Sequence, residues 1–445
     1  MSIITLFSGI LKATVGFFVE YIAVILPLLT GIYFTLHTRF VQVRCFFEGV
    51  RLLFQKEKSV GISPLAALSA AIGSAVGVGN VVGAAAAIVI GGAGAVLWMW
   101  IAAFFGMAVV YSEAKTALET REETKGGFSG GPALYIEKTF RGGGGRFLSA
   151  VFSLSAVLAL GFSGGALQSS VVCSTVSASF RISPLLISVS LAFFTLIAVT
   201  GGVARVSKIC EKTVLLISLL FLATLLLVII KNIEFLPICF KMIFKSAFNI
   251  RSVSGGGAAA MFITVGQGVK KGIYSNEAGL GTSPHIHAAT SYPSPHKAGV
   301  VAMQSVFVDS FVILSATSLA MLSVAVASGV TDFSAENPDM MMQNALASVF
   351  GEGTAAAIIA VSLILFGYSS IISWNYIGSL NARRLFGEKS LVPYFIISTV
   401  FVGLGGVIES GFLWYLSDFL NVFMILPNCM ALILYKKRKT LRQNA

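Results

Sequence analysis

The sequence has few charged residues, and this scarcity decides the class of protein. Asp, Glu, Lys and Arg make up 11% of the 445 residues, whereas hydrophobic residues make up 56%. A soluble globular domain carries about 25% charged residues. The composition therefore excludes an ordinary soluble protein and indicates an integral membrane protein with many spans.

Cysteine pairs and enzyme motifs are also missing. The five cysteines are scattered, with no Cys-x-x-Cys pair, so neither a disulfide framework nor a metal cluster is expected. No His-Glu-x-x-His motif occurs, and His285 and His287 have no third ligand nearby in the sequence. Repeated filter motifs and rings of charge, which are typical of channels, are missing as well. We therefore expect neither an enzyme nor a channel, and no organic cofactor.

Acidic residues are outnumbered by basic ones, 19 to 31, which leaves a net charge of +12. Most of the Lys and Arg residues lie in short loops between apolar runs, where they set orientation, so no nucleic-acid partner is predicted. With loop 37–63 taken as cytoplasmic, the basic residues concentrate on that side, Lys270 and Lys271 being counted among them. The positive-inside rule then predicts a multi-pass plasma-membrane protein with its N-terminus outside and its C-terminus in the cytoplasm.

Eleven apolar runs are each long enough to cross the bilayer, for which about 20 residues suffice. They cover residues 15–36, 64–90, 95–118, 147–178, 184–203, 213–231, 255–272, 298–327, 353–380, 391–408 and 413–435. We predict an all-α polytopic membrane protein with eleven transmembrane helices. The outer segment 232–251 has an amphipathic pattern that predicts a helix lying along the membrane interface.

Glycine interrupts the second of these runs, in Gly73-Ser-Ala-Val-Gly-Val-Gly-Asn80-Val-Val-Gly83. A break here frees backbone N–H and C=O groups at mid-membrane depth, where lipid offers them no partner. The N-terminus of a half-helix favours a carboxylate, and unwound carbonyls favour a cation. The alternative is close packing of unbroken helices through small residues.

A second glycine cluster occurs five spans later. Gly255-Gly-Gly257 is followed by Gly266, Gly268 and Gly272, and we predict a second break near Gly256. Breaks at matching positions indicate two inverted five-helix repeats with a binding site between them at the midplane. Residues 1–60 would form an extra N-terminal helix and basic loop, 61–231 the first repeat, and 232–445 the interfacial segment and second repeat.

Several longer motifs resemble the alanine or glycine:cation symporter family. They are Gly91-Gly-Ala-Gly-Ala-Val-Leu-Trp98-Met-Trp100-Ile-Ala-Ala-Phe-Phe-Gly106, Gly131-Pro-Ala-Leu-Tyr-Ile-Glu-Lys138, Lys271-Gly-Ile-Tyr-Ser-Asn-Glu-Ala-Gly-Leu-Gly-Thr-Ser-Pro284 and Ser373-Trp-Asn-Tyr-Ile-Gly378. The family usually has Phe at Leu97 and Thr at Val78. The resemblance spans nearly the whole chain and implies a LeuT-type fold. It also implies Na+-driven uptake of a small neutral amino acid, alanine or glycine. A proton-coupled transporter of a small amino acid is the alternative.

The segment Gly73–Asn80 also resembles the first broken helix of sodium:neurotransmitter symporters. These resemblances, together with positions beside the predicted breaks and serines, give the expected site residues. The backbone around Gly77, Val78, Gly79 and Gly256 would bind the substrate, and its pocket would be lined by Gln168, Met261, Phe262 and Trp374. Na+ would be bound by the carbonyls of Gly73 and Val76 together with the hydroxyls of Ser369 and Ser370. A second ion would use Ala75 and Asn80. The alternatives are structural: an interhelical hydrogen bond for Asn80, bonds to the i−4 carbonyl for the serines, and plain packing for the pocket residues.

Four polar residues are candidates for gating or coupling. Ser275, Asn276 and Glu277 follow Lys270 and Lys271, and we expect them to form an inner gate at the cytoplasmic end of the sixth helix, with Glu277 paired to a basic residue. A capped turn is the alternative. Asp309 is an intramembrane carboxylate, which makes it a functional candidate. The sequence leaves the oligomeric state open.

Overall fold

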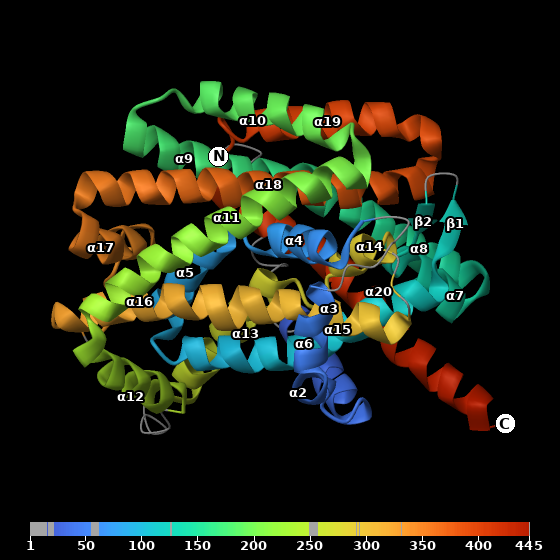
Figure 1. The fold of residues 1–445 in the computed structure, drawn as a ribbon, viewed down its shortest axis with the longest axis horizontal. Coiled ribbons are helices and arrows are strands. Elements are labelled where there is room, and N and C mark those ends of the chain that lie inside the picture. Colours follow the sequence, from blue (N-terminus) through green and yellow to red (C-terminus); the bar gives the residue numbers. More distant parts are fainter. Residues whose placement is uncertain are drawn as a thin grey trace.

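The computed structural model describes residues 16, 22–54, 62–124, 127–248, 257–290, 292, 294–330 and 332–444. Helices dominate this part of the chain (Figure 1). A helix over Ile22–His37 comes first. The first half then holds α2 (Val41–Arg44), α3 (Phe46–Leu53), α4 (Pro64–Ala75), η1 (Gly79–Gly83), α5 (Ala84–Gly91), α6 (Ala95–Thr120), α7 (Pro132–Phe140), α8 (Gly142–Ala156), η2 (Val157–Gly164), α9 (Gly165–Phe180), α10 (Pro184–Val199) and α11 (Gly202–Lys231).

The second half repeats this helical character. It comprises η3 (Ile233–Phe235), α12 (Leu236–Ala247), α13 (Gly257–Asn276), α14 (Ser283–Ala288), α15 (Pro295–Val306), η4 (Phe307–Leu314), α16 (Ser315–Ala327), α17 (Pro338–Phe350), α18 (Glu352–Phe386), η5 (Glu388–Ser390), α19 (Leu391–Leu404) and α20 (Ser410–Asn444). Two short strands, β1 (Glu122–Thr124) and β2 (Gly127–Ser129), pair as an antiparallel hairpin between α6 and α7.

Six of the helices described are long and apolar enough to cross a membrane, and a bent pair, Pro64–Ala75 with Gly79–Gly91, makes up to seven. Ile22–His37 and Pro184–Val199 are shorter apolar helices. These lengths confirm a helical, multi-pass architecture, while the number of eleven crossings stays a prediction. Helix α12 lies within the segment for which an interfacial helix is predicted.

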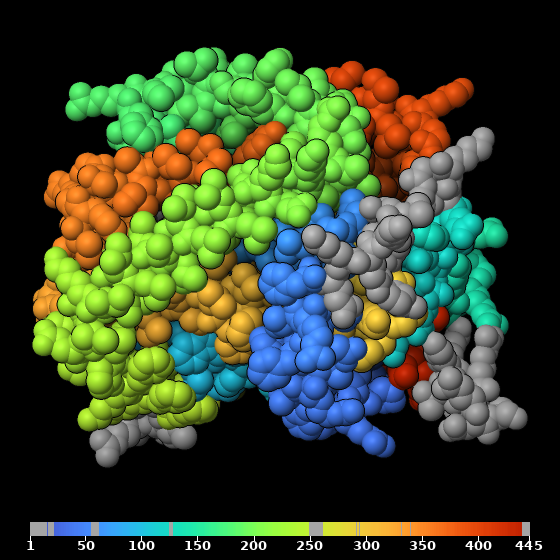
Figure 2. Space-filling model, viewed as in Figure 1, coloured from blue at the N-terminus to red at the C-terminus, as the bar shows by residue number. Residues whose placement is uncertain are grey.

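Large apolar side chains cover the outer helices. Figure 2 shows α11 running diagonally across one face of the molecule, and Leu216, Leu219 and Leu220 of this helix are more than half exposed. Lipid solvates such a surface, since hydrocarbon is as apolar as leucine. The inner helices instead pack through small residues. For example, Gly299 of α15 lies against the ring of Tyr111 in α6, where an added Cβ would come within 2.5 Å.

Lys270 and Lys271, which the orientation prediction counts on the cytoplasmic side, lie inside α13. The Lys270 ammonium forms an ion pair of 2.9 Å with Asp418 of α20, and the Lys271 ammonium lies 5.0 Å from the centre of the Trp414 ring. Asp418 and Trp414 of α20 stabilise both ammonium groups within the helix bundle. The sequence alone could not show that these residues lie next to the two lysines. The orientation of the termini stays a prediction.

Candidate functional site

The second apolar run is a broken helix, as predicted. Helix α4 begins where the Ser63 hydroxyl accepts a hydrogen bond of 3.1 Å from the amide of Ala66. It ends before Val76, whose ψ of 95° is outside the helical range. The chain resumes helical structure as η1 and α5, at an angle of 55° to α4. The break therefore falls at Val76 and Gly77.

This break releases two backbone carbonyls. In a continuous helix, the carbonyls of Gly73 and Val76 would accept bonds from the amides of Gly77 and Asn80, four residues on. The Gly77 amide instead donates to Asn80 Oδ1 at 3.2 Å, and the Asn80 amide to the Gly77 carbonyl at 3.3 Å. The two carbonyls are therefore available to other partners.

Helix α18 brings hydroxyls to these carbonyls. Ser370 Oγ lies 3.0 Å from the Gly73 carbonyl, 3.4 Å from that of Val76 and 3.1 Å from that of Phe366. The Ser369 hydroxyl donates to the Phe366 carbonyl at 2.8 Å. One hydroxyl hydrogen serves one acceptor at a time, so acceptors are in excess here. Such a cluster of hard oxygens suits an alkali cation.

The structure thus brings together four of the residues predicted to bind Na+, namely Gly73, Val76, Ser369 and Ser370. Both serine hydroxyls also contact the carbonyl of Phe366 in their own helix, and this is the local bonding that the structural alternative predicts for the serines. Among the described contacts, none joins Ala75 to Asn80, so the second ion site stays a prediction.

Backbone amides lie next to this oxygen cluster. The Val78 amide donates to Gln168 Oε1 of α9 at 3.2 Å, and Gln168 is buried. At Gly77 an added Cβ would lie 2.8 Å from both Gln168 Nε2 and Ser370 Oγ, so a larger residue would displace these polar atoms. At Gly79 an added Cβ would meet no atom within 4 Å. The amides of Val78 and Gly79 open the second half-helix, where the helix dipole favours a carboxylate.

A second break lies about 20 residues after Gly256, near which a break is predicted. Gly256 is outside the described residues, so the break predicted there stays a prediction, and α13 runs without interruption from Gly257 to Asn276. The chain unwinds at Glu277–Thr282, with positive φ at Glu277 (57°), Gly279 (88°) and Gly281 (80°). Gly268 and Gly272 pack against α6. A Cβ added to Gly268 would lie 2.4 Å from Ala95 O, and one added to Gly272 would lie 3.1 Å from Met99 Cα. For these glycines the packing alternative holds.

The signal for this break was present in Ser275-Asn-Glu-Ala-Gly-Leu-Gly281, which was read as a gate at the helix end. Glu277 is buried and has no basic partner among its described contacts, contrary to the expected ion pair. Its carboxylate accepts bonds from Ser74 Oγ (2.9 Å), Thr282 Oγ1 (2.5 Å) and Trp374 Nε1 (2.7 Å). Ser74 lies next to the first break, so Glu277 connects the two breaks.

A second buried carboxylate makes a similar connection. Asp309 of η4 accepts hydrogen bonds from Asn80 Nδ2 at 2.7 Å, Ser275 Oγ at 2.9 Å and Ser310 Oγ at 2.8 Å. Asn80 belongs to the first break and Ser275 precedes the second. Asn276 Nδ2 donates to Ser310 Oγ at 3.3 Å. The four gate candidates therefore lie together at the breaks.

The remaining pocket candidates lie apart from one another. Trp374 donates to Glu277 and packs on Gly164, where an added Cβ would lie 2.9 Å from the indole ring. Met261 is half-buried, and the side chain of Phe262 is 78% exposed. Both precede the second break by about four helical turns, roughly 22 Å along the helix axis. They lie far from the break at Glu277, and their assignment to a pocket wall stays a prediction.

A cavity of about 370 Å³ opens directly beyond the first break. Val81 and Val82 of η1 form one wall, and further residues come from α9, α17, α18 and α20, including Thr175 and Trp414. A cavity of this size can accommodate a small solute. It leads to the half-helix that carries the Val78 and Gly79 amides.

Two interrupted helices that meet through buried carboxylates, beside a cluster of carbonyl and hydroxyl oxygens, define a class of protein. This is the secondary transporter with a LeuT-type fold. The solved structure of MhsT in complex with L-phenylalanine matches with a TM-score of 0.62 at 15% identity, covering 85% of this chain and 90% of that chain. The likeness concerns the fold.

The sequence comparisons identify the family. A model of the sodium:alanine symporter family matches residues 4–442, and the chain belongs to this family. The sodium/alanine symporter AgcS of Methanococcus maripaludis is 33% identical over 418 residues, 92% of this chain and 90% of the relative. The amino-acid carrier protein AlsT of Bacillus subtilis is 30% identical over 431 residues, 96% of this chain and 90% of the relative. The chain is thus a cation-coupled amino-acid symporter and not an enzyme.

Proposed function

We propose that this chain imports a small neutral amino acid, alanine or glycine, together with Na+. The observation that carries the proposal is the convergence of the Gly73 and Val76 carbonyls, released by the first break, on the hydroxyl of Ser370. This set contains only oxygen donors, which favours a hard cation. The family description and the name of AgcS, a sodium/alanine symporter, support the same cation and substrate.

Coupling follows from how closely the two sites adjoin. The carbonyl of Val76 belongs to the oxygen cluster, and the amide of Val78 lies two residues later. A cation in the oxygen cluster and a substrate carboxylate at the Val78 amide would attract each other in a dry interior, where charge interactions are strong. Each would therefore raise the affinity for the other. Gln168, which accepts the bond from the Val78 amide, would give way to the carboxylate or bind beside it.

The work available from Na+ is sufficient for accumulation. One monovalent ion crossing 100 mV releases about 2.3 kcal/mol, before any concentration difference is added. That energy corresponds to roughly 50-fold accumulation of a neutral substrate for each ion. We infer that the repeats in 61–231 and 232–445 rock against each other around the site, with the N-terminus outside and the cation entering with the substrate.

Proton coupling is the second candidate, and the two buried carboxylates favour it. Glu277 and Asp309 both lie at the breaks, where a proton could replace a cation as the bound charge. Their hydrogen bonds come entirely from neutral donors, so both carboxylates lack a fixed counter-ion among their described contacts.

Uptake by proteoliposomes separates these candidates. We expect labelled alanine to accumulate when Na+ is outside and a negative potential is set inside, and to fail to accumulate when choline replaces Na+. Accumulation in choline that follows an imposed pH gradient would show proton coupling instead. Competition by glycine, serine and glutamine at fixed Na+ tests the substrate class. Strong competition by glutamine would overturn the restriction to small side chains.

A further inference from the structure

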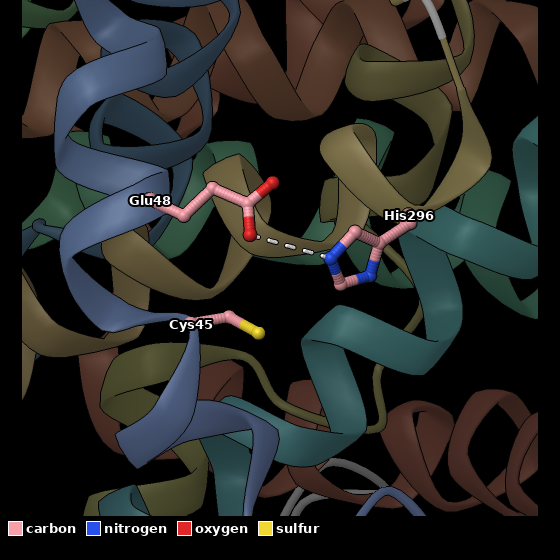
Figure 3. Close-up of side chains that lie close together, drawn as sticks. All are labelled: Cys45, Glu48 and His296. Atoms are coloured by element: carbon pink, nitrogen blue, oxygen red, sulfur yellow. Dashed lines mark ion pairs between the residues drawn. The ribbon is translucent and has the colours of Figure 1, made fainter.

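Three side chains of different chemistry converge away from the transport site. Cys45 lies between α2 and α3, Glu48 in the first turn of α3, and His296 in the first turn of α15 (Figure 3). One donor atom of each lies within 4.8 Å of those of the other two. Glu48 Oε2 and His296 Nε2 are 3.5 Å apart. We propose that these residues form a binding site for a divalent transition-metal ion, with Zn2+ as the best-suited cation.

The donor set fits such an ion. Thiolate sulfur, imidazole nitrogen and carboxylate oxygen are the ligands that Zn2+ uses in proteins, and three of them leave a fourth position for water. Tetrahedral bonds of about 2.0–2.3 Å place ligand atoms roughly 3.3–3.8 Å apart. The present separations are up to 1 Å wider. Rotation of the exposed Glu48 side chain and of the Cys45 thiol can close that gap without moving a helix.

The positions of the first two ligands favour joint binding. Cys45 and Glu48 are three residues apart, so they face the same side at the start of α3. In Figure 3, both point from this segment toward the imidazole of His296, which comes from the opposite side. Within the part of the chain that the structure describes, this is the one group of three such side chains close enough to share an ion.

A buried tyrosine orients the third ligand. Tyr111 of α6 is 4% exposed, and its hydroxyl lies 2.8 Å from His296 Nδ1. When Nδ1–H donates to this oxygen, Nε2 carries the free lone pair and faces Cys45 and Glu48. Histidines that bind metals usually donate their other N–H to such an outer partner. The contact therefore holds the ring in the orientation that a metal requires.

Nearby basic residues do not exclude a cation. Arg44 and Lys297 adjoin the cluster in sequence, and the Lys115 ammonium lies 5.6 Å from the centre of the Tyr111 ring. A bound metal keeps the thiol deprotonated, so Cys45 and Glu48 together supply two negative charges to the ion. The metal would join α3, in the loop after the first helix, to the start of α15, about 250 residues later in the chain.

The test uses the purified full chain without a histidine tag, stripped of metal with a chelator. Co2+ is the probe, because bound cobalt shows a thiolate charge-transfer band and visible bands of tetrahedral coordination. We expect one equivalent of Co2+ to produce both, and Zn2+ to displace it. Cys45→Ser should abolish the charge-transfer band. Glu48→Gln and His296→Gln should each weaken Zn2+ binding by about 10-fold or more, and Tyr111→Phe by about 10–100-fold, as outer partners do.

His37→Gln is the matched control, since His37 is exposed and lies outside the cluster, and it should bind Co2+ as the unaltered chain does. Glu48 is exposed and can be replaced without loss of packing, which keeps the test valid if the Cys45 variant folds poorly. Absence of the charge-transfer band in the unaltered chain, or equal Zn2+ affinity in all four variants, would overturn the proposal.

Discussion

At the scale of single residues, Ser370 connects α18 to the first break. Its hydroxyl reaches two carbonyls of the first break and one of its own helix. No other described side chain contacts all three. Because each oxygen around a small cation replaces a water molecule, the loss of one ligand weakens binding without altering the fold.

The replacement Ser370→Ala tests this role. We expect the Na+ concentration for half-maximal uptake to rise at least 10-fold, equivalent to about 1.4 kcal/mol, with the maximal rate recovered at high Na+. The measurement is alanine uptake by proteoliposomes over a range of Na+ concentrations. Ser379→Ala is the control, because the described contact of that hydroxyl is to Tyr376 O within its own helix. An unchanged Na+ dependence in the Ser370 variant would remove this residue from the cation site.

At the scale of secondary-structure elements, glycine has two different uses in this chain. Gly279 and Gly281 adopt positive φ, which permits the unwound segment between α13 and α14. Gly268 lies within regular helix, where its lack of a side chain lets α13 approach α6 closely. The residue type is the same, and only its neighbours distinguish a break from a packing contact.

Two glycines two residues apart in α13 separate these uses experimentally. Gly268→Ala should lower stability by about 1–3 kcal/mol, because its Cβ would lie 2.4 Å from Ala95 O and push the helices apart. Gly266→Ala, whose Cβ meets nothing within 4 Å, should be neutral or slightly stabilising, since alanine favours helix. Thermal melting of the two variants in detergent gives the comparison. Equal melting temperatures would contradict close packing at Gly268.

At the scale of the whole molecule, charged side chains among the apolar helices need partners of opposite charge, and the ion pair of Lys270 with Asp418 is an example. Lys270 and Asp418 are about one-sixth exposed and join α13 to α20. An unpaired charge at membrane depth costs about 2.5–3.5 kcal/mol on insertion scales. Asp418 follows Trp414, which lies in the wall of the cavity beyond the first break, by about one helical turn.

A charge exchange tests this pair. Lys270→Asp and Asp418→Lys should each reduce the amount of folded protein in the membrane, because each places two like charges together. The double variant should recover most of it, because an ion pair forms again. Size-exclusion chromatography of the detergent-extracted protein measures the yield. The exposed pair Lys138–Glu122 is the control, and its exchange should have little effect. If the double variant gives as little folded protein as the single variants, the ion pair is not the reason for the reduced yield.

The amino-acid sequence by itself determined the membrane class, the helical architecture and the first break. Long apolar runs and scarce charge have one stable solution, which is helices in lipid, and four glycines in eleven residues around Gly77 indicated where one of them opens. Tertiary structure alone decided where the second break lies and which partners Glu277 and Asp309 have. Helix packing determines whether a glycine such as Gly268 approaches a neighbour or bends the chain, and that depends on α6, about 170 residues away. The same holds for Cys45 and His296, which only the folded chain brings together.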